Sequence, residues 1–339
     1  MSDLIYQILI AILVILVVVL AIVIIRKELQ LKRSKKWNKF LFAWGFREIE
    51  SYKKALYTEW NIKPENLQKC EMDLGKGQFG IVTKGKLKIE DSVFDVAIKS
   101  LKENHKDLDV LDFFEEYSLM KRFDHKNIIK LLGISVLNEP LEFVMEFAPL
   151  GDLKNYLLAN EKSIMRIELF RFGLQVCEGL NYLHSLSILH RDLSARNVLV
   201  FEDGIVKISD FGMARNVKYT NGIFTRNRAE NIPLKWMPLE AIEFGTYSVK
   251  SDVWSFGVLL WEIFSFGKEP YCEDNFETYI AKLKNHEHLE NPLLSDVDIY
   301  NMMCNCWRER NLRPGTEFLI QDLNLFLTAK NHNLSVVIV

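Results

Sequence analysis

Two things are scarce in this 339-residue chain: cysteine and any excess of positive charge. The five cysteines form no C-x-x-C pair, which argues against a zinc site or a disulfide framework and favours reduced thiols in a cytosolic compartment. A net charge of −2 excludes a uniformly basic protein, so we expect no nucleic-acid partner. Hydrophobic residues make up 49% and charged residues 26%, which excludes a chain that is disordered throughout. At about 150 residues per domain, the length suggests two domains or two lobes of one.

A long hydrophobic run lies near the N-terminus. Residues 4–25 hold Leu, Ile or Val at 18 of 22 positions. As a helix, this run would be about 33 Å long, which matches a hydrocarbon core of about 30 Å. A buried soluble helix of this length and purity is the weaker interpretation. A cleaved signal peptide also fits poorly, because residues 1–3 carry no basic charge and no small-x-small site follows the run. We therefore predict a transmembrane helix at 4–25 after an extracellular stub at 1–3.

The next segment is basic and aromatic. Residues 26–54 carry ten Lys or Arg against three Glu, so this side of the span is expected to stay in the cytosol, most simply beneath the plasma membrane. We predict a juxtamembrane segment at 26–66. Its aromatic residues either lie on anionic membrane lipid or pack on the following domain, and both interpretations stay open. The span lacks a G-x-x-x-G face, so nothing in it argues for tight dimerisation. A homodimer stays open on other grounds.

A glycine-rich loop follows. Residues 75–82 read Gly-Lys-Gly-Gln-Phe-Gly-Ile-Val, a pattern that alone is weak and could open a dinucleotide-binding fold. That fold expects a helix after the third glycine, whereas residues 81–87 alternate like a strand. A glycine loop between two strands forms a flap over phosphates, because small residues let backbone N–H groups approach the anion.

Three further motifs follow in order: Val-Ala-Ile-Lys at 96–99, His-Arg-Asp-Leu-Ser-Ala-Arg-Asn at 190–197 and Asp-Phe-Gly at 210–212. With the glycine loop, this ordered set resembles a protein kinase. The resemblance implies an α+β fold with two lobes, a β-rich N-lobe with one helix and a mainly helical C-lobe. The implied boundaries are 67–328 for the kinase domain, 67–147 for the N-lobe, 149–328 for the C-lobe and 329–339 for a short tail.

The resemblance also implies catalytic roles. Phosphoryl transfer needs the γ-phosphate of ATP held in line with an acceptor oxygen. Asp192 is expected to accept the proton of the substrate hydroxyl, with Arg196 in the same loop. Lys99 would contact the α- and β-phosphates and pair with a helix glutamate. The match for that glutamate is Glu116, with Glu115 as the alternate.

Two further groups are implied by the resemblance. Asn197 and Asp210 would supply oxygens to Mg²⁺, a hard cation. Met120, Leu131, His190 and Phe211 would stack as the spine that marks an assembled active state. The residues expected to bind ATP, with Met145 as gatekeeper and the backbone of Glu146 and Ala148 at the hinge, are Gly75, Lys76, Gly77, Gln78, Phe79, Gly80, Val82, Ala97, Lys99, Met145, Glu146, Ala148 and Leu199.

Several segments resemble tyrosine kinases in particular. The catalytic loop has the form D-L-x-A-R-N, and residues 232–237 read Ile-Pro-Leu-Lys-Trp-Met. By resemblance, Pro233 and Trp236 would shape a platform for a tyrosine side chain. Together with the predicted membrane span, these features are similar to receptor tyrosine kinases. The implied substrates are proteins with tyrosine, and the implied cofactors are ATP and Mg²⁺. A kinase-like scaffold without transferase activity is the alternative, and the chain could also be a truncated form of a longer receptor.

Some positions depart from the family pattern or suggest regulation. Leu239 stands where the family has proline, and Gly315 interrupts the segment after Arg313, which raises a question about C-lobe packing. Tyr219 is the tyrosine of the activation segment, and we expect its phosphorylation to order that segment through Arg191; an unregulated tyrosine is the alternative. The apolar end at 336–339 could bind a PDZ-type partner.

Overall fold

The computed structural model describes residues 60–76, 80–102, 107–136, 140–226 and 232–335. The predicted membrane span, the extracellular stub and the juxtamembrane segment up to residue 59 lie outside the described residues. So do Gly77, Gln78 and Phe79 of the glycine loop and the predicted PDZ-binding end at 336–339. Across the described ranges, no helix combines the length and the apolar character that a membrane crossing requires.

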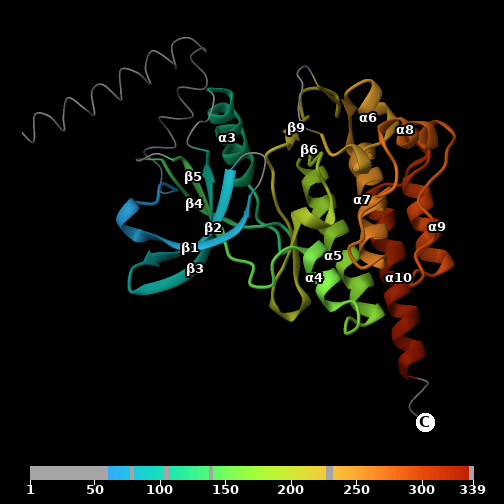
Figure 1. Cartoon of the computed structure of the whole chain (residues 1–339), viewed down its shortest axis with the longest axis horizontal. Helices are drawn as coiled ribbons and strands as arrows, with labels where there is room; N and C mark the ends of the chain where they lie inside the picture. The colour runs from blue at the N-terminus through green and yellow to red at the C-terminus, as the bar shows by residue number, and fades with distance from the viewer. Residues whose placement is uncertain (1–59, 77–79, 103–106, 137–139, 227–231, 336–339) are drawn as a thin grey trace, which may run out of the picture. The chain divides into compact units, whose positions relative to one another are not determined.

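The N-lobe is an antiparallel sheet with strand order β1-β2-β3-β5-β4 (Figure 1). β2 and β3 pair without interruption from Ile89–Ser92 to Gly80–Leu101. Alternation along these strands buries one face, where Leu87, Val96, Ile98 and Val144 pack together. The strands are β1 (Leu67–Lys76), β2 (Gly80–Ile89), β3 (Ser92–Leu101), β4 (Leu131–Ser135) and β5 (Glu142–Glu146).

One described helix, α3 (Asp107–Met120), belongs to this lobe. It has no glycine or proline in its interior, and its Phe113 ring stacks on Phe143 of β5 with centroids 4.1 Å apart. This contact fixes the rotation of the helix against the sheet. Glu116, about one turn after Phe113, is therefore buried on the same side.

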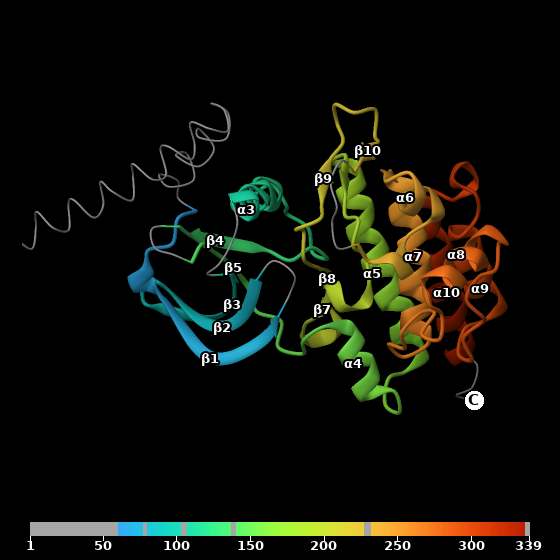
Figure 2. The ribbon, with the colours of Figure 1, turned by 45° about the horizontal axis from the view of Figure 1, so that its top comes forward.

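The C-lobe is built around two helices, α5 and α7. α7 begins where the Ser248 backbone N–H donates to Ser251 Oγ at 3.1 Å. The helix is buried on almost every side, as expected of a helix at the centre of a lobe. Helices α5, α9 and α4 pack against it (Figures 1 and 2). The helices are α4 (Leu153–Asn160), α5 (Arg166–Ser185), α6 (Leu239–Glu243), α7 (Val249–Phe264), α8 (Phe276–Lys284), α9 (Val297–Cys306) and α10 (Thr316–Ser335).

Short two-stranded ladders position the loops of the C-lobe. β6 pairs with β9, β7 with β8 and β10 with β11, all antiparallel. The 190–197 loop therefore runs from β6 to β7, and the 209–214 turn runs from β8 to β9. These strands are β6 (Ile188–Leu189), β7 (Val198–Val200), β8 (Val206–Ile208), β9 (Arg215–Asn216), β10 (Phe224–Thr225) and β11 (Thr246–Tyr247).

The architecture agrees with the sequence in its main features. A β-rich lobe with one described helix and a mainly helical lobe confirm the predicted two-lobed α+β fold. α10 ends at Ser335, so the helix continues beyond residue 328 into the segment predicted as a tail.

Candidate active site

Both lobes line a cavity of about 690 Å³, a size typical of small-ligand sites. Nine of the predicted nucleotide-binding residues line it: Gly75, Gly80, Val82, Ala97, Lys99, Met145, Glu146, Ala148 and Leu199. Lys76 is not part of the lining; it closes β1, where it pairs with Ile81. Asp192, Arg196, Asn197 and Asp210 complete the cavity from the C-lobe. Pro233, predicted as part of the tyrosine platform, also lines the cavity. Lining residues that the sequence analysis did not single out for binding are Leu74, Ile129, Phe147, Gly151, Asp152, Ser209 and Ile232.

Lys99 joins three elements at one end of this cavity. It stands on β3 between Val82 of β2 and Phe143 of β5. Its Nζ donates to Glu116 Oε1 at 2.8 Å and to Asp210 Oδ1 at 3.0 Å. Glu115, the alternate partner, points elsewhere and lies 3.9 Å from Arg215 Nε. The structure therefore selects Glu116 as the partner of Lys99.

The charges in this cluster reinforce one another. Burial disfavours the ammonium form of Lys99, but the carboxylates of Asp210 and Glu116 outweigh that cost and raise the lysine pKa above its usual value. Burial likewise disfavours the Asp210 carboxylate, yet the charge and hydrogen bond of Lys99 hold its pKa below the usual range. Lys99 and Asp210 are accordingly both charged at neutral pH, as phosphate and metal binding would require.

A buried aspartate of α7 shapes the loop that carries Asp192. Asp252 accepts hydrogen bonds from the backbone N–H of His190 at 2.9 Å and of Arg191 at 3.0 Å, and from His184 Nε2 at 3.0 Å. These bonds hold Arg191 at a φ of 69°, a left-handed conformation that a non-glycine residue adopts only when its surroundings fix it. The sequence analysis did not identify Asp252 as part of the site.

Asp192 lies at the cavity with two neighbours from its own loop. Arg196 Nη2 donates to Asp192 Oδ1 at 2.6 Å, and Asn197 Nδ2 donates to the Asp192 carbonyl at 2.7 Å. Burial raises the pKa of Asp192, and the nearby Arg196 charge offsets part of that rise. The arrangement gives a desolvated carboxylate whose basicity is increased, which suits a group that accepts a proton.

The Asp-Phe-Gly turn brings the predicted metal ligands to the same end of the cavity. Asp210 has a φ of 58°, while Phe211 is buried, with its ring centroid 5.2 Å from that of His190. Met120 and Leu131 are buried too. Within the described ranges, no group of three or more His, Cys, Asp or Glu could hold a metal by itself. Mg²⁺ commonly uses one or two protein oxygens and takes its other ligands from phosphates and water, so Asn197 and Asp210 fit such an ion.

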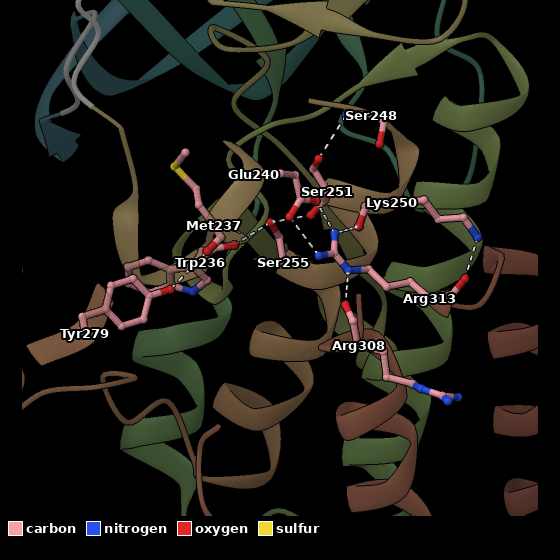
Figure 3. A network of polar contacts seen from close by, with 10 residues as sticks. All are labelled: Trp236, Met237, Glu240, Ser248, Lys250, Ser251, Ser255, Tyr279, Arg308 and Arg313. Atoms are coloured by element: carbon pink, nitrogen blue, oxygen red, sulfur yellow. Dashed lines mark hydrogen bonds and ion pairs between the residues drawn. The ribbon is translucent and has the colours of Figure 1, made fainter. Parts of the chain in front are cut away.

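Hydrogen bonds from helices α7 and α8 hold the 232–237 segment in place (Figure 3). Ser255 Oγ donates to the Trp236 carbonyl at 2.7 Å, and Tyr279 OH donates to the Met237 carbonyl at 3.1 Å. Pro233 lines the cavity, as expected of a platform. Trp236, however, is only 6% exposed and is absent from the cavity lining, so its part in shaping the platform stays a prediction. Its indole lies beneath Arg196, whose guanidinium carbon is 4.5 Å from the ring centroid.

The two departures from the family pattern leave this region intact. Arg313 donates to both carboxylate oxygens of Glu240, at 2.5 and 3.0 Å (Figure 3). Leu239 is the first residue of α6, a position that proline favours and other residues tolerate. A side chain in place of Gly315 would meet only Phe318, at 3.9 Å, so glycine is not required there and disturbs no packing.

Tyr219 and Arg191 differ sharply in exposure. Tyr219 is 89% exposed and Arg191 is 2% exposed. The Arg191 guanidinium donates to the Met213 carbonyl at 3.0 Å and lies over the rings of Phe224 and Tyr247, at 4.3 and 4.2 Å. A phosphate on Tyr219 would have to replace these contacts to reach Arg191, so their predicted regulatory interaction stays a prediction.

Fold and site together define a protein kinase domain. The profile of the protein tyrosine and serine/threonine kinase family matches residues 68–323, and the chain belongs to this family. It is 38% identical over 249 residues to the tyrosine-protein kinase transmembrane receptor Ror of Drosophila melanogaster, covering 72% of this chain and 36% of that protein. It is 36% identical over 271 residues to the tyrosine-protein kinase Fer of Rattus norvegicus, with 80% and 32% covered.

A third relative is the myoblast growth factor receptor egl-15 of Caenorhabditis elegans, 33% identical over 345 residues. That match covers 92% of this chain and 32% of the relative. The chain thus spans about a third of the length of the curated relatives it matches. Both receptor-type and cytoplasmic tyrosine kinases are among the relatives.

Proposed function

We propose that this chain is a membrane-anchored protein tyrosine kinase that transfers the γ-phosphate of ATP to tyrosine hydroxyls of proteins. The observation that carries the proposal is the set of contacts Lys99–Glu116, Lys99–Asp210 and Arg196–Asp192 at one cavity. A scaffold that binds partners without catalysis has no need of all these residues. Their joint presence therefore favours the enzyme.

The cavity suits ATP and Mg²⁺ by its chemistry. Apolar side chains of Val82, Ala97 and Leu199 would enclose the adenine, and Lys99 would bind the phosphates. Asn197 and Asp210 offer the hard oxygen ligands that Mg²⁺ prefers. When bound, the cation neutralises charge on the phosphates.

Each residue of the site then has a separate role in phosphate transfer. Lys99, held by Glu116, orients the phosphates, and Asp192 faces the acceptor hydroxyl. The tyrosine oxygen forms a bond to the γ-phosphorus while the bond from that phosphorus to the bridging oxygen of ADP breaks. The phenolic proton passes to Asp192. Arg196 keeps the Asp192 carboxylate in place through its 2.6 Å hydrogen bond.

Specificity for tyrosine is supported by the lining beyond Asp192. Ile232 and Pro233 border the same cavity as Asp192 and Arg196. An aromatic ring that lies against these two apolar residues could extend its hydroxyl to Asp192. The relatives at 36% and 38% identity, Fer and Ror, are named tyrosine-protein kinases, which supports the same assignment.

The test of the enzyme is phosphate transfer by the full chain, purified in detergent and given Mg-ATP with a tyrosine copolymer or a serine/threonine substrate. We expect transfer to tyrosine alone. The variant Asp192→Asn should lower kcat by at least about 10²-fold, because loss of a general base costs roughly 10²–10⁴-fold. A control variant is Glu178→Gln on α5, which breaks an ion pair with Lys126 and should keep full activity.

Two outcomes would contradict the assignment. Folded protein that binds Mg-ATP without transferring phosphate would support the scaffold instead. Near-normal kcat in Asp192→Asn would show that Asp192 is not the proton acceptor.

Membrane anchoring forms the second part of the proposal. Its support is the 22-residue apolar run at 4–25 with ten basic residues in 26–54. The 92% coverage by the receptor egl-15 means that the likeness extends into the segment before residue 68. Full chain should sediment with membranes and resist extraction by carbonate, whereas the chain lacking residues 1–25 should be released. Retention of the shortened chain would instead make the basic segment the main membrane contact.

A further inference from the structure

A buried glutamate of α7 lies directly beneath the catalytic loop. Glu262 is 0% exposed. Its Oε2 accepts two hydrogen bonds, from the Ala195 backbone N–H at 2.9 Å and from Trp236 Nε1 at 2.9 Å. Its Oε1 is buried and accepts no hydrogen bond from any described residue. Burying a carboxyl group in this way costs folding free energy, so its position suggests a gain elsewhere.

The two donors come from different parts of the chain. Ala195 follows Asp192 in the catalytic loop, whereas Trp236 belongs to the segment whose Pro233 borders the cavity. One oxygen atom of Glu262 therefore sets the distance between the two segments. The catalytic loop and the 232–237 segment are thus both hydrogen-bonded to the same helix, α7, through this oxygen.

The Trp236 indole is linked to Asp192 through Arg196. The Arg196 guanidinium lies 4.5 Å from the Trp236 ring centroid, and its Nη2 donates to Asp192 Oδ1. The other end of the tryptophan is fixed as well, because Ser255 Oγ binds its carbonyl (Figure 3). With both ends held, the ring offers Arg196 a rigid surface, and the orientation of the Asp192 carboxylate depends on that surface.

We propose that Glu262 is a positioning residue for tyrosine phosphorylation: its Oε2 holds Ala195 and Trp236 together and thereby sets Arg196 against Asp192. The inference rests on the proposed function. Hydrogen-bond acceptance is the property used, not negative charge, because both bonds end on one oxygen that a neutral amide also provides.

Three variants of the full chain in detergent test this. Glu262→Leu removes the oxygen that accepts both hydrogen bonds, and kcat for a tyrosine peptide should fall about 10²-fold, the loss that about 1 Å of misplacement causes. Glu262→Gln keeps an acceptor oxygen and should stay within about threefold of the parent. Trp236→Phe keeps a ring for Arg196 but removes the indole donor, and kcat should fall about tenfold. In Glu262→Gln and Trp236→Phe, the KM for Mg-ATP should stay close to that of the parent.

A matched control is Trp254→Phe in the same helix. Trp254 is also buried, but its Nε1 has no hydrogen-bond partner among the described residues. Trp254→Phe removes an indole N–H, as Trp236→Phe does, but it breaks no hydrogen bond to a described residue, so kcat should be unchanged. If Glu262→Leu proves unstable by its Tm, Trp236→Phe still decides, because it leaves Glu262 bound to Ala195.

The outcomes separate cleanly. A parent chain without transferase activity would refute the proposed function before this inference is reached. An active parent with Trp236→Phe at parental kcat overturns the inference. Equal losses in Glu262→Gln and Glu262→Leu, or in Trp254→Phe and Trp236→Phe, overturn it as well.

Discussion

At the scale of single residues, Glu262 has an unusual protonation equilibrium. Burial raises its pKa to about 7, because the hydrogen bonds from Trp236 and Ala195 and the charges of Arg196 and Lys154 offset only part of the desolvation. In the unfolded chain a glutamate titrates near about 4.3. Between these values the folded state binds more protons than the unfolded state, so the free energy of unfolding must fall as pH rises.

This linkage predicts a pH-dependent stability. The contribution of Glu262 is fully present below about pH 4 and is lost by the time the pH has passed about 7, a change of the order of 3 kcal/mol. Glu262→Gln has no proton to lose and should not show it. Urea unfolding of the parent and the variant between about pH 5 and about pH 8 should therefore show the parent losing stability relative to the variant as pH rises. A constant difference across that range would contradict the raised pKa.

The sequence predicts which residues form the site, but it predicts the orientation of their side chains less well. Lys99, Asp192 and Asp210 lie in short motifs, so their presence could be identified without a structure. The direction of the Trp236 ring depends on Ser255 and Glu262, which the sequence separates from it by many residues. A motif fixes residue types in order, but burial is decided by long-range packing.

At the scale of elements, α3 shows where sequence reasoning leaves two answers. Glu115 and Glu116 are neighbours, and adjacent positions of a helix face different directions. Only the stacking of Phe113 on Phe143 decides which of them faces Lys99. The strands were easier to predict, because alternation and the glycine loop mark them locally.

α6 allows a direct test of the departure from the family pattern. Leu239 is the first residue of this helix, and Pro238 before it has an extended backbone, with φ −73° and ψ 160°. Proline fits that position, since its missing N–H is not needed in the first turn and the preceding residue is already extended. Leu239→Pro should therefore stabilise the chain by about 0.4–1 kcal/mol through a less flexible unfolded state.

The measurement is thermal or urea unfolding of Leu239→Pro against the parent. A suitable control is Ile242→Pro, one turn later in α6, where the backbone N–H donates to the Pro238 carbonyl at 3.2 Å. That change should destabilise by about 3 kcal/mol. A destabilised Leu239→Pro would contradict this expectation. It would mean either that packing requires the leucine side chain or that α6 starts at a different residue.

At the scale of the whole described molecule, the two lobes meet around one cavity. Ion pairs cross between them at the site: Glu146 of the N-lobe pairs with Lys207 of the C-lobe, and Lys99 of the N-lobe reaches Asp210 of the C-lobe. The lobes were predictable because each has its own pattern, whereas the Lys99–Asp210 ion pair depends on how the Asp-Phe-Gly turn is oriented. The φ of 58° at Asp210 is a conformation that sequence motifs do not specify.

A ligand that contacts both lobes should therefore stabilise the fold. A non-hydrolysable ATP analogue with Mg²⁺, at about 100 times its Kd, should add about 2.7 kcal/mol and raise Tm by roughly 5–11 °C for a domain of this size. Chelation of Mg²⁺ should shrink the shift, because Asp210 and the phosphates would then face each other without a cation between them. Lys99→Met should shrink the Tm shift too. The control is Lys126→Met: this lysine is exposed and pairs with Glu178, so the variant should keep the full shift. An equal shift with and without Mg²⁺ would show that Asn197 and Asp210 do not bind the metal together with the nucleotide.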